Sequence, residues 1–320
     1  MSLVERALQK IQASDRAKRA ATPTPAVVVG EVVARSELRP APAPKPAPPI
    51  NPNRVVKVDR DALRSSGLLP PVEHEKMLAD QYRAIKRPLI RAAFESSQKR
   101  EGPPGQLIMI ASALPGDGKT FTGVNLAMSM AREADHSVVL VDGDVVKPHL
   151  SKLFGIDREP GLLDVLADET LDVRSVILPT DIPGLSLVPA GTASETATEM
   201  IASARMSHVM QQLVSWNPSG IVLFDSLPIL LTSEARALAT LMGQVVMVIK
   251  AGGTPQQAVA DSLEALGKDK KVWLVLNQAE TSGPLGYYYG SQYGYRGYAD
   301  TSATATDTSA SATPRAPDSA

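Results

Sequence analysis

The stretch that decides the fold is Leu107-Ile-Met-Ile-Ala-Ser-Ala113-Leu-Pro-Gly-Asp-Gly-Lys-Thr120. Its first seven residues form a near-continuous apolar run, which is typical of a strand buried on both faces. The glycines that follow let backbone N–H groups converge on a phosphate, and a helix that begins directly after them favours an anion at its N-terminus. The stretch therefore predicts a strand, a phosphate-binding P-loop and a helix that extends to about Glu133.

Each residue of this loop has an expected task at a bound nucleotide. Lys119 is expected to reach the β- and γ-phosphates of ATP, and the Thr120 hydroxyl is expected to ligate Mg²⁺. The loop departs from the usual G-x4-G-K-[ST] pattern at its first position, which is Ala113. The predicted nucleotide-binding residues are Pro115, Gly116, Asp117, Gly118, Lys119, Thr120 and Phe121, together with Asn277 at the end of a later apolar run.

Acidic residues follow two more apolar runs. The run 139–141 leads into Asp142 and Asp144, and the run 221–224 leads into Asp225. A carboxylate at the C-terminal end of a buried parallel strand points into the crevice where ligands bind. Each aspartate alone could cap a helix, but beside a P-loop we expect them to supply Mg²⁺ or water ligands and a base.

The rest of the globular region alternates strand and helix signals. Such alternation, with strands apolar on both faces, predicts an α/β fold with a mostly parallel sheet covered by helices on both faces. Together with the P-loop, this arrangement resembles the P-loop NTPases of the MinD/ParA-like type. The further strands are expected at 55–58, 137–141, 185–189, 221–224, 245–249 and 272–276. The helices are expected at 72–87, which Pro88 ends or kinks, and near 161–168, 196–215, 232–242 and 255–267.

Five segments follow from the composition along the chain. Residues 1–20 indicate a short amphipathic helix, either a frayed terminus or a docking helix, and residues 21–53 form a linker rich in proline and alanine. The globular domain is expected at 54–280, a tyrosine- and glycine-rich tail at 281–298, and a disordered segment at 299–320 that contains almost no large apolar residue.

The overall composition excludes several classes of protein. The net charge of −1 favours neither nucleic acid nor anionic lipid, so no nucleic-acid partner is expected. The absence of cysteine excludes disulfides and thiolate metal sites, and it fits a reducing cytosol. No apolar run approaches the roughly 20 residues needed to span a bilayer.

Six of the seven tyrosines fall between residues 287 and 298, where they alternate with glycines. Glycine at this density opposes both helix and strand, so we expect a solvated segment rather than core. A nucleotide site combined with a strip of phenols suggests an enzyme that phosphorylates its own tail. The expected phosphoacceptors are Tyr287, Tyr288, Tyr289, Tyr293, Tyr295 and Tyr298.

The P-loop, the Asp142-x-Asp144 strand, Asp225 and the tyrosine cluster, in this order, resemble the bacterial tyrosine kinases (BY-kinases) of capsule and exopolysaccharide synthesis. Three further stretches resemble the exosortase-associated (EpsG-like) branch, in which the kinase is separate from its membrane activator. These stretches are Met1-Ser-Leu-Val-Glu-Arg-Ala-Leu, Gly67-Leu-Leu-Pro-Pro and Asp80-Gln-Tyr-Arg-Ala-Ile-Lys-Arg-Pro-Leu.

The resemblance implies a catalytic role for each acid and for Lys119. Asp142 would accept the proton of the incoming tyrosine, and Asp144 would help to place metal or substrate. Asp225 would hold Mg²⁺ directly or through water, so the implied metal ligands are Thr120, Asp142 and Asp225. The implied reaction transfers phosphate from ATP to protein tyrosine.

The resemblance also implies partners and an oligomeric state. The family's E-x2-R-x2-R ring motif corresponds to Asp80, Arg83 and Lys86, and lysine lacks the planar fork of arginine. The family usually has an arginine after D-x-D, where this chain has Val146 and Lys147, so Lys147 is the expected source of positive charge. The usual D-x-P-P reads Asp225-Ser-Leu-Pro228. We expect a cytoplasmic homo-oligomer, which a transmembrane chain-length-determinant-type activator recruits to the inner membrane and a tyrosine phosphatase resets.

Two rival functions are weighed against this one. A MinD/ParA-like ATPase shares the fold but carries an early signature lysine, where this loop has Leu114. A non-enzymatic scaffold could stack tyrosines on RNA bases, yet Arg296 is the one cation within the tyrosine strip. Formation of phosphotyrosine by the purified protein separates all three.

Overall fold

The structure is a computed structural model that describes residues 54–95 and 102–279. These residues belong to one of the chain's two compact units, Pro46–Ala320. The predicted segments 1–20, 21–53, 281–298 and 299–320 lie outside the described residues, and so do the six clustered tyrosines.

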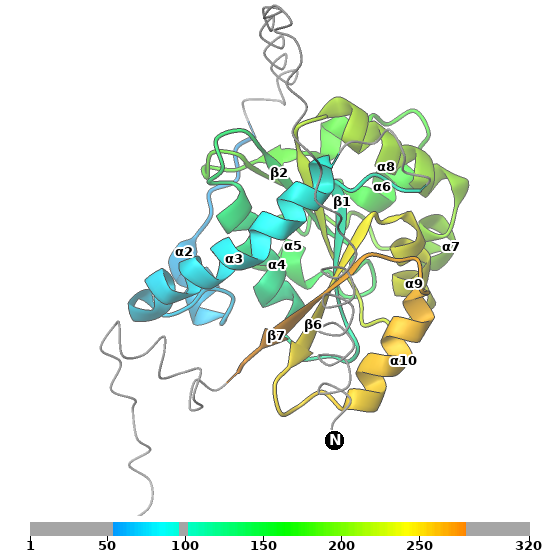
Figure 1. The fold of residues 1–320 in the computed structure, drawn as a ribbon. Coiled ribbons are helices and arrows are strands. Elements are labelled where there is room, and N and C mark those ends of the chain that lie inside the picture. The colour runs from blue at the N-terminus through cyan, green and yellow to red at the C-terminus, as the bar shows by residue number, and fades with distance from the viewer. Residues whose placement is uncertain (1–53, 96–101, 280–320) are drawn as a thin grey trace, which may run out of the picture. The chain divides into compact units, whose positions relative to one another are not determined.

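A seven-stranded sheet runs through this unit in the order β3-β4-β2-β5-β1-β6-β7 (Figure 1). Every pairing between neighbouring strands is parallel except that of β3 with β4, so the prediction of a mostly parallel sheet is confirmed. The strands are β1 Leu107–Ser112, β2 Val138–Asp142, β3 Leu178–Pro179, β4 Leu185–Val188, β5 Ile221–Asp225, β6 Gln244–Lys250 and β7 Val272–Asn277.

The central strands are apolar on both faces because helices cover both sides of the sheet. Alternate residues of β1 enter two separate cores, Ile108 and Ile110 on one side and Leu107 and Met109 on the other. Helices α3 and α4 pack on the first side, and α6, α8 and α9 pack on the second (Figure 1). The edge strand β7 instead alternates half-buried with exposed residues.

The helices of the described part are short, with one exception. None of them, within residues 54–95 and 102–279, is both long and apolar enough to cross a membrane. Their bounds are α2 Arg60–Ser65, α3 Glu75–Phe94, α4 Lys119–Met130, α5 His149–Leu153, α6 Leu162–Ala167, α7 Ala197–Ile201, α8 Ala204–Trp216, α9 Ser233–Leu241 and α10 Gln256–Leu266, with 3-10 turns at Val72–His74 and Val173–Val176.

Of the two effects expected of Pro88, an end or a kink of the helix, the end is wrong. Helix α3 continues through Pro88 to Phe94, although proline cannot donate a backbone hydrogen bond. Leu89, Ala92 and Ala93 of the extra turns are buried, so tertiary packing outweighs the missing bond.

Other expectations differ in detail. The single helix expected at 196–215 is two helices, because Ser203 accepts a hydrogen bond from the Met206 N–H and begins α8 anew. Helix α4 ends at Met130 rather than near Glu133. The strand expected at 55–58 is reduced to one bridge between Val56 and Thr180.

Candidate functional site

The P-loop lies between the end of β1 and the start of α4, as expected. Gly118 precedes the helix with φ of 94°, a conformation that favours glycine. A Cβ atom at this position would lie 2.0 Å from Nδ2 of Asn277, so any residue larger than glycine would collide with Asn277. Gly116 has φ of 82° but open space around it.

Asp117 braces the loop from inside. One carboxylate oxygen accepts the Leu114 N–H at 3.2 Å, and the other accepts the Thr254 hydroxyl at 2.8 Å. The Asp117 carbonyl accepts Nδ2 of Asn277 at 2.9 Å. The Asp117 side chain is buried and engaged in these bonds, so it shapes the loop, and the expected contact of this residue with the nucleotide stays a prediction.

Thr254 had no signal in the sequence, because it lies 137 positions from Asp117. Asn277 had two candidate roles, contact with the nucleotide base or capping of the strand end, and the structure adds a third, support of the P-loop. Thr254 reaches the loop from the segment between β6 and α10, and Asn277 reaches it from the end of β7, which β6 separates from β1.

The first turn of α4 carries Lys119, Thr120 and Phe121, all partly buried. The Lys119 ammonium is close enough to Asp144 and Asp225 to oppose the rise of their carboxyl pKa values. Phe121 and Asn277 line a small hollow of about 60 Å³ beside this turn. Phe121 also borders a larger groove of about 610 Å³ that reaches Pro70.

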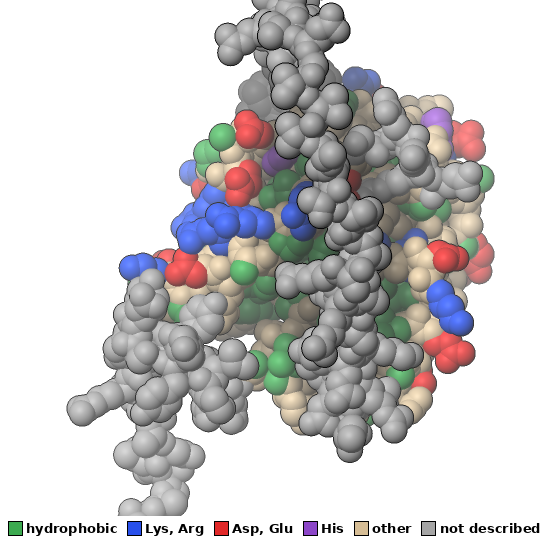
Figure 2. All heavy atoms as spheres, viewed as in Figure 1, with side chains coloured by type: hydrophobic (Ala, Val, Ile, Leu, Met, Phe, Trp, Pro, Cys, Tyr) green, Lys and Arg blue, Asp and Glu red, His purple; other side chains and the backbone are tan. Residues whose placement is uncertain are grey.

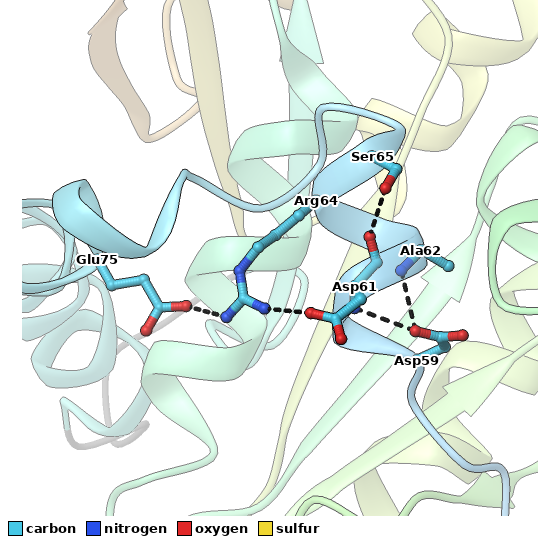
Figure 3. A network of polar contacts seen from close by, with 6 residues as sticks. All are labelled: Asp59, Asp61, Ala62, Arg64, Ser65 and Glu75. Carbon is cyan, nitrogen blue, oxygen red and sulfur yellow. Dashed lines mark hydrogen bonds and ion pairs between the residues drawn. The ribbon is translucent and has the colours of Figure 1, made fainter.

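Figure 3 shows a polar network beside this larger groove, which two of its residues, Arg64 and Ser65, line. The carboxylate of Asp59 accepts the backbone N–H groups of Asp61 and Ala62 and so caps α2. The Arg64 guanidinium bridges Asp61 and Glu75, which ties α2 to the start of α3. These ion pairs add to apolar packing, since Leu63 of α2 is buried in the core.

The two predicted acidic strand ends are adjacent. Asp142 ends β2, Asp225 ends β5, and the two are register partners in the sheet. Both side chains are buried, with exposed fractions of 0% and 3%. Strand order thus brings together two carboxylates that are 83 residues apart in the chain.

Helix α5 positions Asp142. One oxygen of its carboxylate accepts both the Ser151 N–H at 2.7 Å and the Ser151 hydroxyl at 2.6 Å. Burial raises the pKa of Asp142 to about 6, against the lowering effect of these two hydrogen bonds. Sequence reasoning missed Ser151, which carries no motif.

Asp144 lies in the loop that follows and is less buried than Asp142. Burial raises the pKa of its carboxyl, and a hydrogen bond from the Lys147 N–H, at 2.8 Å, opposes the rise. Lys147 therefore contacts Asp144 through its backbone, which leaves its ammonium exposed.

The Asp225 carboxylate has one oxygen with no hydrogen-bond partner. Its Oδ1 atom is buried without a hydrogen bond, and burial raises the pKa of the group to about 7, against the lowering effect of the Thr120 hydroxyl. A buried, unsatisfied carboxylate oxygen next to a threonine hydroxyl fits Mg²⁺, which prefers oxygen ligands. Within the described residues no cluster of three or more His, Cys, Asp or Glu could hold a metal alone.

The predicted oligomerisation residues divide into two groups. Asp80 and Arg83 form an exposed ion pair with 2.5 Å between Oδ1 and Nη1. Lys86 turns inward, with 5% of its surface exposed. Its Nζ donates to the Ser129 carbonyl at 2.5 Å and pairs with Glu133 at 2.6 Å, so it joins α3 to the end of α4.

The chain is similar to known P-loop proteins and kinases over most of the described residues. Residues 105–257 match the ParA family model, described as NUBPL iron-transfer P-loop NTPase. EpsB of Ralstonia nicotianae is 30% identical over 206 residues, which cover 64% of this chain but 27% of that protein. The tyrosine-protein kinase YwqD of Bacillus subtilis is 26% identical over 247 residues, which cover 77% of this chain and 97% of YwqD.

A solved structure shares the fold. The kinase domain of the Escherichia coli tyrosine kinase ETK aligns with a TM-score of 0.54 and 24% identity, over 64% of this chain and 78% of that domain. The chain is thus similar to bacterial proteins named as tyrosine-protein kinases, and it shares the fold of the ETK kinase domain.

Proposed function

We propose that this chain is an ATP-dependent tyrosine autokinase that modifies its own C-terminal tyrosines and regulates exopolysaccharide polymerisation and export. The observation that carries the proposal is the pair of buried aspartates, Asp142 and Asp225, beside a P-loop lysine. Relatives named tyrosine-protein kinase, and one named succinoglycan biosynthesis transport protein, support it.

In this proposal the chain's own residues bind and orient ATP. The backbone N–H groups of the loop and the N-terminus of α4 hold the phosphates, and Lys119 offsets the charge that develops on the transferred group. The Asp117 brace keeps the loop open for phosphate before ATP arrives, so little reorganisation is needed.

Asp142 is proposed as the base that accepts the phenol proton. Free tyrosine has a pKa near 10, so a nearby acceptor assists attack at neutral pH. A carboxylate with a pKa of about 6 is ionised at pH 7 yet more basic than an ordinary aspartate. Ser151 orients the group, and Asp144 helps to place the tyrosine or the metal.

Mg²⁺, when bound, would neutralise phosphate charge, held by the Thr120 hydroxyl and Asp225, with Asp142 as a further ligand. Asp225 then gains the partner that its buried oxygen lacks. We do not propose the iron transfer named by the family model, because cysteine, the usual ligand of iron–sulfur clusters, is absent.

A membrane-bound activator completes the proposal. EpsB of Ralstonia nicotianae, of which this chain spans 27%, is much longer than the kinase region. We infer that a separate transmembrane protein of the export machinery supplies the activating segment, with the exposed pair Asp80 and Arg83 as its docking surface or as the contact between subunits. A phosphatase returns the tail to its starting state.

The decisive experiment measures phosphotyrosine on the purified full chain incubated with ATP and Mg²⁺. We expect modification within 287–298, and we expect Lys119→Met to abolish it while the thermal unfolding of the protein stays unchanged. Normal phosphotyrosine in that folded variant would contradict the site, and ATP hydrolysis without phosphotyrosine would favour a MinD/ParA-like ATPase.

A further inference from the structure

Helix α3 carries an exposed row of arginines with no role in the site described above. Arg83, Arg87 and Arg91 are spaced four residues apart, so they lie on one face of the helix, here called the arginine stripe. All three side chains are exposed. Figure 2 shows Lys and Arg side chains gathered over the region where Figure 1 places α3.

The positive charge of the stripe is only partly neutralised. Arg83 pairs with Asp80, but α3 has no acidic residue after Asp80, and neither Arg87 nor Arg91 forms an ion pair within residues 54–95 and 102–279. Glu133 is near enough to Arg87 for the two charges to interact, but its Oε1 atom already forms an ion pair with Nζ of Lys86 at 2.6 Å. Two guanidinium groups are thus available for an anionic ligand.

We propose that the arginine stripe is a phosphotyrosine-binding surface for the chain's own phosphorylated segment 287–298. This inference rests on the proposed autokinase activity. Each phosphotyrosine adds about −1.5 to −2 charges and three strong acceptor oxygens. The planar guanidinium fork of arginine binds such a group through paired, charge-assisted hydrogen bonds.

Chain length and the point of exit favour this occupant over a separate partner. Leu276 and Asn277 at the end of β7 line the same small hollow as Gln81 and Tyr82 of α3. The chain therefore leaves the sheet beside the middle of α3. From there Arg91 is about 14 Å farther along the helix, at 1.5 Å per residue.

The intervening chain is long enough to reach it. The eight residues from 279 to 287 can span up to about 26 Å, and those to Tyr298 about 60 Å. Segment 287–298 contains a single cation, Arg296, so its phosphorylated form has little opposite charge of its own. Docking within one chain also gives the segment a high effective concentration at the stripe.

This surface would connect modification to assembly. Arg83 belongs both to the stripe and to the predicted oligomerisation residues, one helical turn from Arg87. A phosphorylated segment docked along the stripe would cover Arg83 and compete with a second subunit. Tail phosphorylation would then separate subunits because the docked segment covers the surface through which they bind each other. Repulsion between phosphorylated tails would be a second contribution.

The test uses a synthetic fluorescent peptide of residues 285–298 with phosphate on Tyr293, Tyr295 and Tyr298, titrated into the full-length Lys119→Met protein. Because the peptide is phosphorylated chemically and the protein is kinase-inactive, the result does not depend on autokinase activity. We expect saturable binding that ATP does not displace and that weakens with salt. The unphosphorylated peptide should bind at least about tenfold more weakly.

Matched variants locate the binding surface. We expect the double substitution Arg87→Gln and Arg91→Gln to lower affinity about tenfold or more, whereas Arg236→Gln on the exposed face of α9 leaves it unchanged. Equal binding of both peptides, or no effect of the double substitution, would overturn the proposal. Binding to phosphatidylglycerol vesicles through the same arginines, with no phosphopeptide binding, would assign the stripe to a membrane surface instead.

Discussion

Asp142 and Asp225 stand side by side at the ends of β2 and β5, and the N–H of the next residue, Gly143, donates to the Asp225 carbonyl at 2.7 Å. Two buried carboxylates at neighbouring register positions disfavour each other's ionisation. The pKa values of both are raised, mainly by burial, to about 6 and about 7. The sheet therefore holds a site that is electrostatically incomplete without a cation or a proton.

We expect the raised pKa values of these carboxyls to make the stability of the metal-free protein depend on pH. A carboxyl whose pKa is higher in the folded than in the unfolded state stabilises the fold below its unfolded pKa, and this contribution is lost as the pH rises through the folded pKa. The loss for Asp225 should fall between about pH 4 and pH 7. Urea unfolding at pH 5 and pH 8, without Mg²⁺, measures it.

Asp225→Asn removes this titration, because asparagine stays neutral. Relative to the unsubstituted protein, the variant should gain at least about 1 kcal/mol of unfolding free energy between pH 5 and pH 8. Asp261→Asn on the exposed face of α10 serves as the control. A pH slope that is the same in all three proteins would show that Asp225 is ionised throughout.

Substitutions of Asp225 and Asp142 should differ in their effect on nucleotide binding. Asp225→Asn should weaken Mg²⁺-dependent binding of ADP, because it removes a metal ligand. Asp142→Asn should weaken ADP binding less than Asp225→Asn does, because Asp225 carries the unsatisfied oxygen, yet it should abolish phosphotyrosine formation, since a base acts in the transition state. Calorimetric titration with and without Mg²⁺ checks this, and equal binding defects in both variants would mean that the roles are wrongly assigned.

The contact between Gly118 and Asn277 makes a further prediction. Gly118→Ala places a methyl group 2.0 Å from the Asn277 amide nitrogen and should weaken ADP binding at least about tenfold. Gly116→Ala imposes a similar left-handed strain, with φ of 82° against 94°, but meets open space. The difference between the two variants isolates the steric effect, and identical affinities would show that Asn277 moves aside freely.

Lys86 should contribute to stability more than its surface neighbours. Lys86→Met leaves the Ser129 carbonyl and Glu133 without their buried partner, and we expect a loss of about 1–3 kcal/mol in urea unfolding. Arg87→Met, one residue along and exposed, should change stability by less than about 0.5 kcal/mol. Similar losses in both variants would contradict the inward role of Lys86.

The positions of the central strands along the chain and the P-loop were predictable from the sequence for a simple reason. Runs such as 107–111 and 221–224 are apolar on both faces, a pattern typical of a central parallel strand. Gly116 and Gly118 adopt positive φ angles, and glycine in the sequence already indicates such a conformation at each position. Helix ends were less predictable, as Pro88 inside α3 shows, because burial of Leu89 is a tertiary event.

The chemical identity of the site was thus determined by the sequence alone: a P-loop with Lys119, and acids at two strand ends. Only the tertiary structure decided which side chains surround them. Ser151 on Asp142, Thr254 on Asp117 and the inward turn of Lys86 all join residues far apart in the chain or on different elements. Motifs record local backbone geometry, whereas these contacts depend on how strands and helices are placed in space, which no short stretch of sequence encodes.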